Sequence, residues 1–255
     1  MDAAGLYLDL LKRTVTGTIY GREPNHDYEL RDLPAFVRDF TEHYMHGQAH
    51  AMVPLTRLDN VQHCVTDVIK NDVEGDLIET GVWRGGTSIF MRGILAAYDV
   101  RDRAVWVADS FEGLPKPDPE RFPKEARAVA GKTIAEDYKN FAASLEEVQA
   151  NFRSYGLLDD QVHFLKGWFK NTLPDAPIKK LAVARLDGDL YESTRDALVA
   201  LYPKVSVGGF VIIDDYGEDM WTECRRAVDE YRAENGIEDK IVEVCSKCVY
   251  WQRTG

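Results

Sequence analysis

The stretch DLIETGVWRGGTS, residues 76–88, decides which fold we expect for this chain of 255 residues. A short apolar strand ends in an acidic residue, and a glycine-rich turn then leads into a helix. Glycine lets a ligand approach the backbone, and the start of a helix favours negative charge. A dinucleotide site has the spacing G-x-G-x-x-G, but Trp83 stands here where the second glycine belongs. The spacing acid-x-Gly-x-x-x-Gly is instead typical of an S-adenosylmethionine (SAM) site, where Glu79 can face the ammonium group of the ligand. A glycine-rich turn without a ligand is the alternative.

Apolar runs like this first strand recur along the chain and alternate with helical stretches. They lie at 104–108, 161–165, 181–186 and 209–213, and the helical stretches lie at 87–99, 141–156, 191–203 and 221–235. Strands that alternate with helices favour a doubly wound α/β fold with a mostly parallel sheet. Two more apolar runs, at 241–244 and 249–252, lie so close together that we expect an antiparallel hairpin at one edge of the sheet.

The chain before residue 73 has a different pattern, which predicts an N-terminal helical extension (1–72) ahead of the sheet domain (73–255). Residues 20–54 mix charge, proline and aromatic residues without a clean period, and we expect a partly helical, mobile segment there. Residues 115–140 hold many charges and several prolines, which predicts an insertion that serves as a lid or binding loop. Apolar residues repeat at helical spacing near both ends of the extension: Leu6, Leu10, Leu11 and Val15, then Leu58, Val61, Val65 and Val68.

The composition argues against several kinds of partner. The chain has 31 Lys and Arg against 43 Asp and Glu, a formal net charge of −12. Such an acidic chain is poorly suited to bind nucleic acid or an anionic membrane surface. No apolar run approaches the roughly 20 residues that cross a bilayer, and the first residues have no signal-peptide pattern. Four cysteines do not make a disulfide scaffold. We therefore expect a soluble, cytoplasmic protein.

The second strand also ends in an acidic residue, in the sequence VADSFEGLP (107–115). Asp109 follows Gly81 by 28 positions. An acid at this place of a Rossmann-like unit can accept hydrogen bonds from both ribose hydroxyls of a nucleoside. The position therefore supports a nucleoside cofactor without choosing which one. An aspartate that caps a loop or a helix is the alternative.

Two pairs of aspartates follow the fourth and fifth strands. Asp187 and Asp189 come after the strand at 181–186, and Asp214 and Asp215 come after the strand at 209–213. Neighbouring parallel strands end at the same edge of a sheet, where ligands bind, so four carboxylates converge there. Without a counter-charge they would repel one another and raise each other's pKa values. A divalent cation removes that repulsion, and oxygen ligands alone suit Mg²⁺ or Mn²⁺ better than Zn²⁺. Separate, solvated loop caps are the alternative.

Together these segments resemble the macrocin and mycinamicin type of SAM-dependent sugar O-methyltransferases, which act in antibiotic biosynthesis. The resemblance runs from about Leu6 to Arg253. It implies a class I SAM-dependent methyltransferase (Rossmann-like) fold, dependence on Mg²⁺, and a homodimer or higher homo-oligomer whose N-terminal helices help to form the interface. The segments that carry it are 79–86, 106–115 (WVADSFEGLP), 155–162 (YGLLDDQV), 167–169 (GWF), 186–189 and 212–216.

The resemblance also implies a role for each site residue. Asp187, Asp214 and Asp215 would hold the metal, and Asp189 would be the general base. The SAM site would be lined by ten residues: Glu79, Thr80, Gly81, Arg84, Gly86, Ser88, Asp109, Ser110, Gly167 and Trp168.

The reaction that this implies is transfer of a methyl group from SAM to a hydroxyl of a sugar or deoxysugar on a glycosylated natural product. The first alternative is an O-methyltransferase for a catechol or another vicinal diol, since a metal can bind two adjacent hydroxyls there as well. An NAD-dependent oxidoreductase is a second alternative, against which the missing second glycine argues. A non-catalytic protein that binds SAM or metal is a third, but four carboxylates exceed what SAM binding alone requires.

Overall fold

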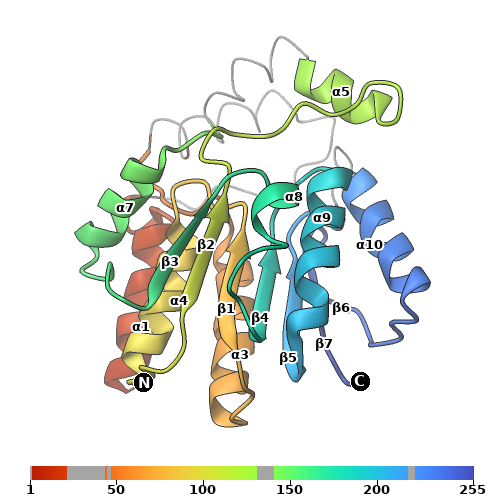
Figure 1. Cartoon of the computed structure of the whole chain (residues 1–255). Coiled ribbons are helices and arrows are strands. Elements are labelled where there is room, and N and C mark those ends of the chain that lie inside the picture. The colour runs from red at the N-terminus through yellow and green to blue at the C-terminus, as the bar shows by residue number, and fades with distance from the viewer. Residues whose placement is uncertain (1, 22–43, 45–46, 131–140, 218–221) are drawn as a thin grey trace.

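The computed structural model describes residues 2–21, 44, 47–130, 141–217 and 222–255, and within them the chain forms a seven-stranded sheet (Figure 1). The strand order is β3-β2-β1-β4-β5-β7-β6. The strands β1 to β5 pair in parallel, whereas β7 is antiparallel to both β5 and β6. The predicted doubly wound sheet with an antiparallel hairpin at one edge is therefore present. The strands are β1 (Asp76–Thr80), β2 (Val105–Asp109), β3 (Val162–Lys166), β4 (Leu181–Leu186), β5 (Val205–Ile213), β6 (Val242–Glu243) and β7 (Val249–Gln252).

Helices cover both faces of the sheet (Figure 1). One face carries α1 (Ala3–Val15), α3 (Leu55–Lys70), α4 (Gly86–Ala97) and α7 (Leu145–Ser154). The other carries α8 (Phe169–Thr172), α9 (Tyr191–Leu201) and α10 (Thr222–Glu234). The helix α5 (Pro123–Ala130) lies beyond the carboxyl ends of the strands, above α9 and α10 in the view of Figure 1. Two short 3₁₀ helices, η1 (Thr18–Tyr20) and η5 (Tyr202–Lys204), complete these elements.

Alternate side chains of the central strands supply two separate apolar cores. Leu77 of β1 and Val183 of β4 lie in the core beneath α1, α3 and α4. Ile78 and Ala184, one residue further along the same strands, lie in the core beneath α9 and α10. Because successive side chains of a strand point to opposite faces, a strand buried on both faces is apolar almost throughout. This burial explains why the central strands were visible in the sequence as continuous apolar runs.

The first helix packs into the core through two of the four residues of its predicted apolar repeat. The predicted helix at Leu6–Val15 is present, but Leu6 and Leu10 are 60% and 53% exposed. Leu11 and Val15 of the repeat are buried, and the third buried residue at helical spacing is Leu8, which the repeat did not include. Gly93 of α4 permits this contact, because a Cβ atom there would lie 2.2 Å from Cδ2 of Leu11.

Some predicted elements differ in extent. The strand β5 begins at Val205, four residues before the predicted start at 209, and its register with β4 shifts between Leu181 and Val183. The helices α5 and α8 lie in segments where no helix was predicted. Much of the expected mobile segment 20–54 (22–43 and 45–46) and part of the expected lid 115–140 (131–140) lie outside the described residues.

No helix in the described ranges is both long enough and apolar enough to cross a membrane.

Candidate functional site

Three aspartates meet at the carboxyl edge of the sheet. Asp187 follows β4, and Asp214 and Asp215 follow β5. Each offers one carboxylate oxygen, and these three oxygens lie within 4.8 Å of one another. Among the described residues, this is the one group of three or more acidic, histidine or cysteine side chains that could hold a metal ion. The convergence predicted for four carboxylates at two adjacent strand ends is therefore confirmed for three of them, and Asp189 is not part of this group.

Two buried arginines that the sequence analysis did not identify lie beside these carboxylates. Arg185 of β4 is 1% exposed, and its Nη2 lies 2.6 Å from Oδ1 of Asp214. Its Nη1 lies 2.8 Å from Oδ2 of Asp187. Arg57 of α3 is 7% exposed and forms an ion pair with Oδ2 of Asp214. Both oxygens of Asp214 are thus paired with guanidinium groups, one of them from the N-terminal part of the chain.

The arginines do not remove all of the charge repulsion at this edge. Burial and the neighbouring Asp214 raise the pKa of Asp187 to about 6. Burial, together with Asp189 and Asp187, raises the pKa of Asp215 well above its usual range. Asp214 is the exception: burial acts to raise its pKa, but Arg185 and Arg57 hold that pKa below its usual value. A surplus of negative charge on hard oxygen donors is what Mg²⁺ or Mn²⁺ would neutralise, so these residues fit such an ion.

Asp189 lies beside the three aspartates in an unusual backbone conformation. Its φ angle is +56°, in the left-handed region that residues other than glycine rarely adopt. Its backbone N–H donates a hydrogen bond of 3.1 Å to Oδ2 of Asp215. The N–H of Leu190 donates a hydrogen bond of 2.5 Å to the carbonyl of Gly188, so that Asp189 lies between donor and acceptor in a tight turn. The turn therefore holds the predicted general base next to a predicted metal ligand.

Glu79, at the end of β1, is 1% exposed and has a partner on each carboxylate oxygen. Nη1 of Arg185 lies 2.6 Å from its Oε1, and the hydroxyl of Ser88 donates to its Oε2. Burial raises the pKa of Glu79 to about 7, although Arg185 and Ser88 act to lower it. Two predicted SAM-site residues, Glu79 and Ser88, thus contact each other, and Arg185 connects them to the aspartates.

The glycines of the turn after β1 are required by packing. Gly81 has a φ angle of +82°, and a Cβ atom there would lie 1.6 Å from the carbonyl oxygen of Asp187. Gly86 donates its N–H to the carbonyl of His50 at 2.8 Å, and a Cβ atom on Gly86 would lie 2.4 Å from the carbonyl carbon of His50. The turn is therefore pressed against β4 on one side and against the N-terminal segment on the other.

Asp109 joins the ends of β1, β2 and β3. Its Oδ2 accepts the N–H of Val82 at 2.7 Å, and its Oδ1 accepts the N–H of Phe111 at 2.7 Å. Its carbonyl accepts the N–H of Gly167 at 2.8 Å. Burial raises its pKa, although these backbone donors act in the opposite direction. Asp109 therefore holds the glycine-rich turn in place, whatever it contributes to a ligand.

The remaining predicted SAM-site residues lie around the same edge. Ser110 donates to the carbonyl of Gly113 at 2.7 Å, and half-buried Trp168 precedes α8. Thr80 is fully buried, and its carbonyl accepts the N–H of Asp187 at 2.9 Å.

Arg84, another predicted SAM-site residue, binds the backbone of the N-terminal segment. Its Nη1 donates to the carbonyls of Tyr44 and Ala49, each at 3.1 Å, and its guanidinium lies 4.4 Å from the centre of the Trp83 ring. These contacts hold the N-terminal segment against the turn.

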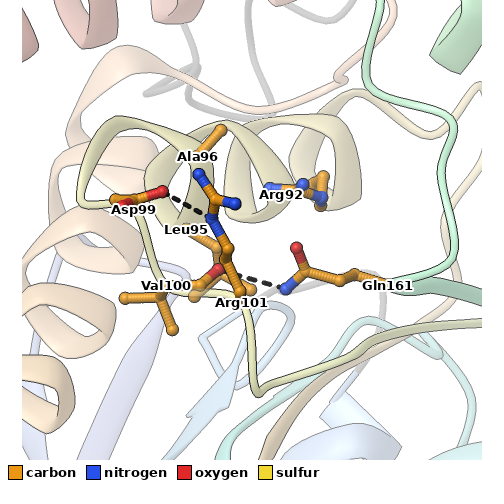
Figure 2. Close-up of a pocket in the computed structure, with 7 residues that line it drawn as sticks. All are labelled: Arg92, Leu95, Ala96, Asp99, Val100, Arg101 and Gln161. Atoms are coloured by element: carbon orange, nitrogen blue, oxygen red, sulfur yellow. Dashed lines mark hydrogen bonds and ion pairs between the residues drawn. The ribbon is translucent and has the colours of Figure 1, made fainter.

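A surface hollow of about 330 Å³ lies at the other end of the sheet and does not belong to this site (Figure 2). It is formed where α4 ends and β2 and β3 begin, that is, at the amino ends of the strands. Arg101 pairs with Asp99 across it at 2.7 Å, and Gln161 donates to the carbonyl of Val100 at 3.1 Å (Figure 2). Ligands of open α/β sheets bind at the carboxyl ends instead.

Comparisons with known proteins agree with this architecture. Residues 38–253 match the family model of macrocin O-methyltransferase (TylF). The chain is 51% identical to mycinamicin III 3''-O-methyltransferase of Micromonospora griseorubida, over 98% of this chain and 96% of that protein. It is also 51% identical to 8-demethyl-8-(2,3-dimethoxy-alpha-L-rhamnosyl)-tetracenomycin-C 4'-O-methyltransferase of Streptomyces olivaceus, over 99% and 94%. The solved structure of the O-methyltransferase NovP has a TM-score of 0.84 and 51% identity, and covers 99% of this chain and 100% of that chain. The expected methyltransferase fold is thereby confirmed.

Proposed function

Since the chain belongs to the TylF family of macrocin O-methyltransferases, we propose that it transfers a methyl group from SAM to a sugar hydroxyl of a glycosylated natural product, with Mg²⁺ held by Asp187, Asp214 and Asp215. The names of two relatives support a sugar as acceptor, because one contains a rhamnosyl group and the other a 3''-O position. The aspartate cluster beside the glycine-rich turn is the observation that carries the proposal.

Because the glycine-rich turn contacts the end of β4, the proposed SAM site and the proposed acceptor site lie side by side. The absent Cβ of Gly81 lets the turn touch the carbonyl of Asp187. A methyl donor bound over the turn would therefore lie next to an acceptor bound at the aspartates. Methyl transfer needs the acceptor oxygen, the methyl carbon and the sulfur nearly in line, and this adjacency favours such an arrangement.

A bound Mg²⁺ would lower the pKa of an acceptor hydroxyl and fix the orientation of that hydroxyl. We assign the proton transfer to Asp189, whose carboxylate takes the proton as the acceptor oxygen attacks. The new bond joins that oxygen to the methyl carbon. The bond from the methyl carbon to sulfur breaks, its electron pair stays on sulfur, and S-adenosylhomocysteine leaves.

On the SAM side, we assign Glu79 and Asp109 to the amino-acid and ribose ends of the cosubstrate. Asp109 is held by the N–H groups of Val82 and Phe111, so its position would be fixed before SAM binds. Glu79 has a positive partner in Arg185, which would have to share that carboxylate with the ammonium group of SAM.

We also propose a homodimer or higher homo-oligomer through the N-terminal helices. Support comes from three neighbouring side chains of α1, Leu6, Tyr7 and Leu10, which are 60%, 37% and 53% exposed. An apolar group of this kind on a surface helix is typical of a protein–protein contact.

The test is a methyl-transfer assay on glycosides that the relatives are named for, mycinamicin III and the dimethoxyrhamnosyl tetracenomycin, with catechol as a third acceptor. Each acceptor is incubated with the protein and SAM under three conditions: with Mg²⁺, with EDTA, and with EDTA followed by excess Mg²⁺. Mass spectrometry then measures the masses of the products. We expect one of the glycosides to gain one methyl group. EDTA should abolish this methylation, and excess Mg²⁺ should restore it. Methylation of catechol alone would overturn the sugar acceptor, and full activity in EDTA would overturn the metal.

A further inference from the structure

The start of α9 is capped by a side chain from another part of the chain. Oε1 of Glu125, in α5, accepts the backbone N–H of Tyr191 at 2.7 Å. Tyr191 is the first residue of α9, and Leu190 before it provides no side-chain cap. The first N–H groups of a helix have no partner within the helix and need an acceptor from elsewhere. Glu125 is 1% exposed, so this acceptor replaces water at a buried helix end.

Aromatic and cationic contacts fasten the same two segments together. Phe122, three residues before Glu125, is 2% exposed, and its ring stacks on that of Tyr191 with centroids 4.9 Å apart and an interplanar angle of 28°. The guanidinium group of Arg226 in α10 lies 4.6 Å from the centre of the Tyr191 ring and 5.6 Å from that of Phe122. The beginning of α5 is therefore bound to α9 and α10 by several contacts of different kinds, in the place where Figure 1 shows it above both helices.

These contacts hold the start of α9, directly after the turn that carries Asp189. Asp189 stands two residues before Tyr191, and its φ angle of +56° is costly for an aspartate. Such a conformation persists only where the surroundings fix it on both sides. On one side, the N–H of Asp189 is bound to Asp215. On the other, the chain enters α9 at Tyr191, where Glu125 and Phe122 hold it.

We propose that Glu125 is a positioning residue for Asp189: by capping α9 at Tyr191, it keeps the turn 188–190 in the conformation that methyl transfer uses. The inference rests on the proposed function of Asp189 as general base. It assigns to the segment before residue 131 a role in orienting the base, in addition to any contact with the acceptor. Glu125 itself touches neither reacting atom, so its effect is indirect.

The charged groups around Glu125 indicate which of its properties matters. Glu223 and Arg226 of α10 and Glu192 of α9 face it, and burial with the two glutamates raises its pKa to about 7, against the effects of Tyr191 and Arg226. A negative charge is therefore not favoured at this position, whereas an oxygen that accepts the Tyr191 N–H is needed. Glutamine keeps that oxygen without the charge, and alanine removes it.

The test compares Glu125→Ala with Glu125→Gln, and uses Glu120→Ala, an exposed carboxylate of the same segment, as a matched control. Hydrogen exchange of the peptide 188–195 is measured first, because it requires no activity. We then measure kcat and KM for the acceptor, and the affinities for SAM and for Mn²⁺.

We expect Glu125→Ala to speed exchange in 188–195 and to lower kcat by about tenfold to a hundredfold, the effect of a small misplacement of a catalytic group. The affinities for SAM and Mn²⁺ should stay within about twofold of wild type, and Glu125→Gln and Glu120→Ala should resemble wild type. Unchanged exchange and kcat in Glu125→Ala would overturn the inference, and so would a Glu125→Gln variant as impaired as the alanine variant. If the wild type transfers no methyl group, the proposed function fails, while the exchange data still decide whether Glu125 holds the turn.

Discussion

Arg185 and Glu79 form a fully buried ion pair, with 2.6 Å between Nη1 and Oε1. They come from neighbouring strands, β4 and β1, and are paired in register as Glu79 and Arg185. Because the same guanidinium group also contacts Asp187 and Asp214, it connects the residues we assign to SAM with the residues we assign to the metal. The two halves of the site thus share one buried cation.

Removal of that cation should be costly. Arg185→Met is expected to lower the free energy of unfolding by about 3–5 kcal/mol, since Glu79, Asp187 and Asp214 remain buried without their partner. Urea denaturation measures this, with Arg195→Met as control, because Arg195 pairs with Glu234 at the surface and should cost no more than about 1 kcal/mol. The double variant Arg185→Met/Glu79→Gln should regain part of the loss. If the two single arginine variants are equally stable, the pairing at Arg185 contributes nothing.

Arg185 also shows where sequence reasoning was incomplete. The fold could be predicted because strands buried on both faces appear as continuous apolar runs, and the aspartates could be placed because neighbouring parallel strands end at one edge. The arginines could not be assigned in the same way. A signal was present at Arg185, the one charged residue in the run 181–186. Arg57 gave none, because it lies in an amphipathic helix whose contact with β5 depends on the tertiary fold.

The sequence predicts the glycine-rich turn after β1, but ligand approach is not the only reason for its glycines. The sequence pattern explains these glycines by the approach of a ligand to the backbone. In the structure, Gly81 and Gly86 are required because a Cβ atom would clash with Asp187 and with His50. Such contacts join segments far apart in the sequence, so spacing within the motif cannot indicate them. The helix α5 was missed for a related reason, because Phe122 just before it and Glu125 within it contact α9 and α10 from a segment rich in proline and charge.

Gly81→Ala should damage the proposed metal site as well as the turn. The φ angle of +82° and the position of its Cβ, 1.6 Å from the carbonyl oxygen of Asp187, require the end of β4 to move. We expect the Mn²⁺ affinity, measured by electron paramagnetic resonance, to fall by at least about tenfold, in line with other losses at the supports of metal ligands. Gly236→Ala is the matched control, because Gly236 has a φ angle of +62° and open space at its Cβ position. Equal Mn²⁺ affinity in both variants would show that the close approach is unimportant.

The stability of Glu125→Gln should depend on pH in a defined way. Burial raises the pKa of Glu125 to about 7, above its usual value of about 4.5, so the folded protein holds this proton more tightly than the unfolded chain. Stability from this group is therefore greatest at low pH and falls as pH rises from about 4.5 to 7. Glutamine removes that loss, so the Tm of Glu125→Gln should exceed that of wild type by about 2–4 °C at pH 8, with a smaller difference at pH 5. Thermal unfolding at both pH values checks this, and a difference that grows toward low pH would contradict it.

Asp109→Ala should weaken SAM binding without affecting the metal. Two causes add: loss of the predicted ribose hydrogen bonds and release of the turn at Val82, together about 1–3 kcal/mol of binding free energy. Isothermal titration with SAM measures the change. Asp76→Ala is a suitable control, because Asp76 also accepts a backbone N–H and a side-chain N–H, but at the amino end of the sheet. Unchanged SAM affinity in Asp109→Ala would remove Asp109 from the site.

The last prediction separates the proposed metal ligands from the proposed base. Asp214 is a poor choice for this test, because its replacement would take from Arg57 its buried ion-pair partner and from Arg185 one of its three acidic partners, and so disturb the fold. Asp215 is better suited. Asn at this position keeps an oxygen for the N–H of Asp189 and removes a charge from a crowded set of carboxylates. Asp215→Asn should therefore weaken Mn²⁺ binding, with methyl transfer recovered at high Mg²⁺.

Asp189→Asn should behave in the opposite way. Its backbone contact with Asp215 remains, so SAM and Mn²⁺ should bind as in wild type, while methyl transfer falls by roughly 10²–10⁴-fold, the usual effect of losing a general base. The two variants are compared by activity against Mg²⁺ concentration at saturating SAM, with Mn²⁺ affinity measured separately. Rescue of Asp189→Asn by metal, together with failure to rescue Asp215→Asn, would reverse the two roles. A loss of Mn²⁺ affinity in both variants would instead make Asp189 a fourth ligand and leave the acceptor proton to another group.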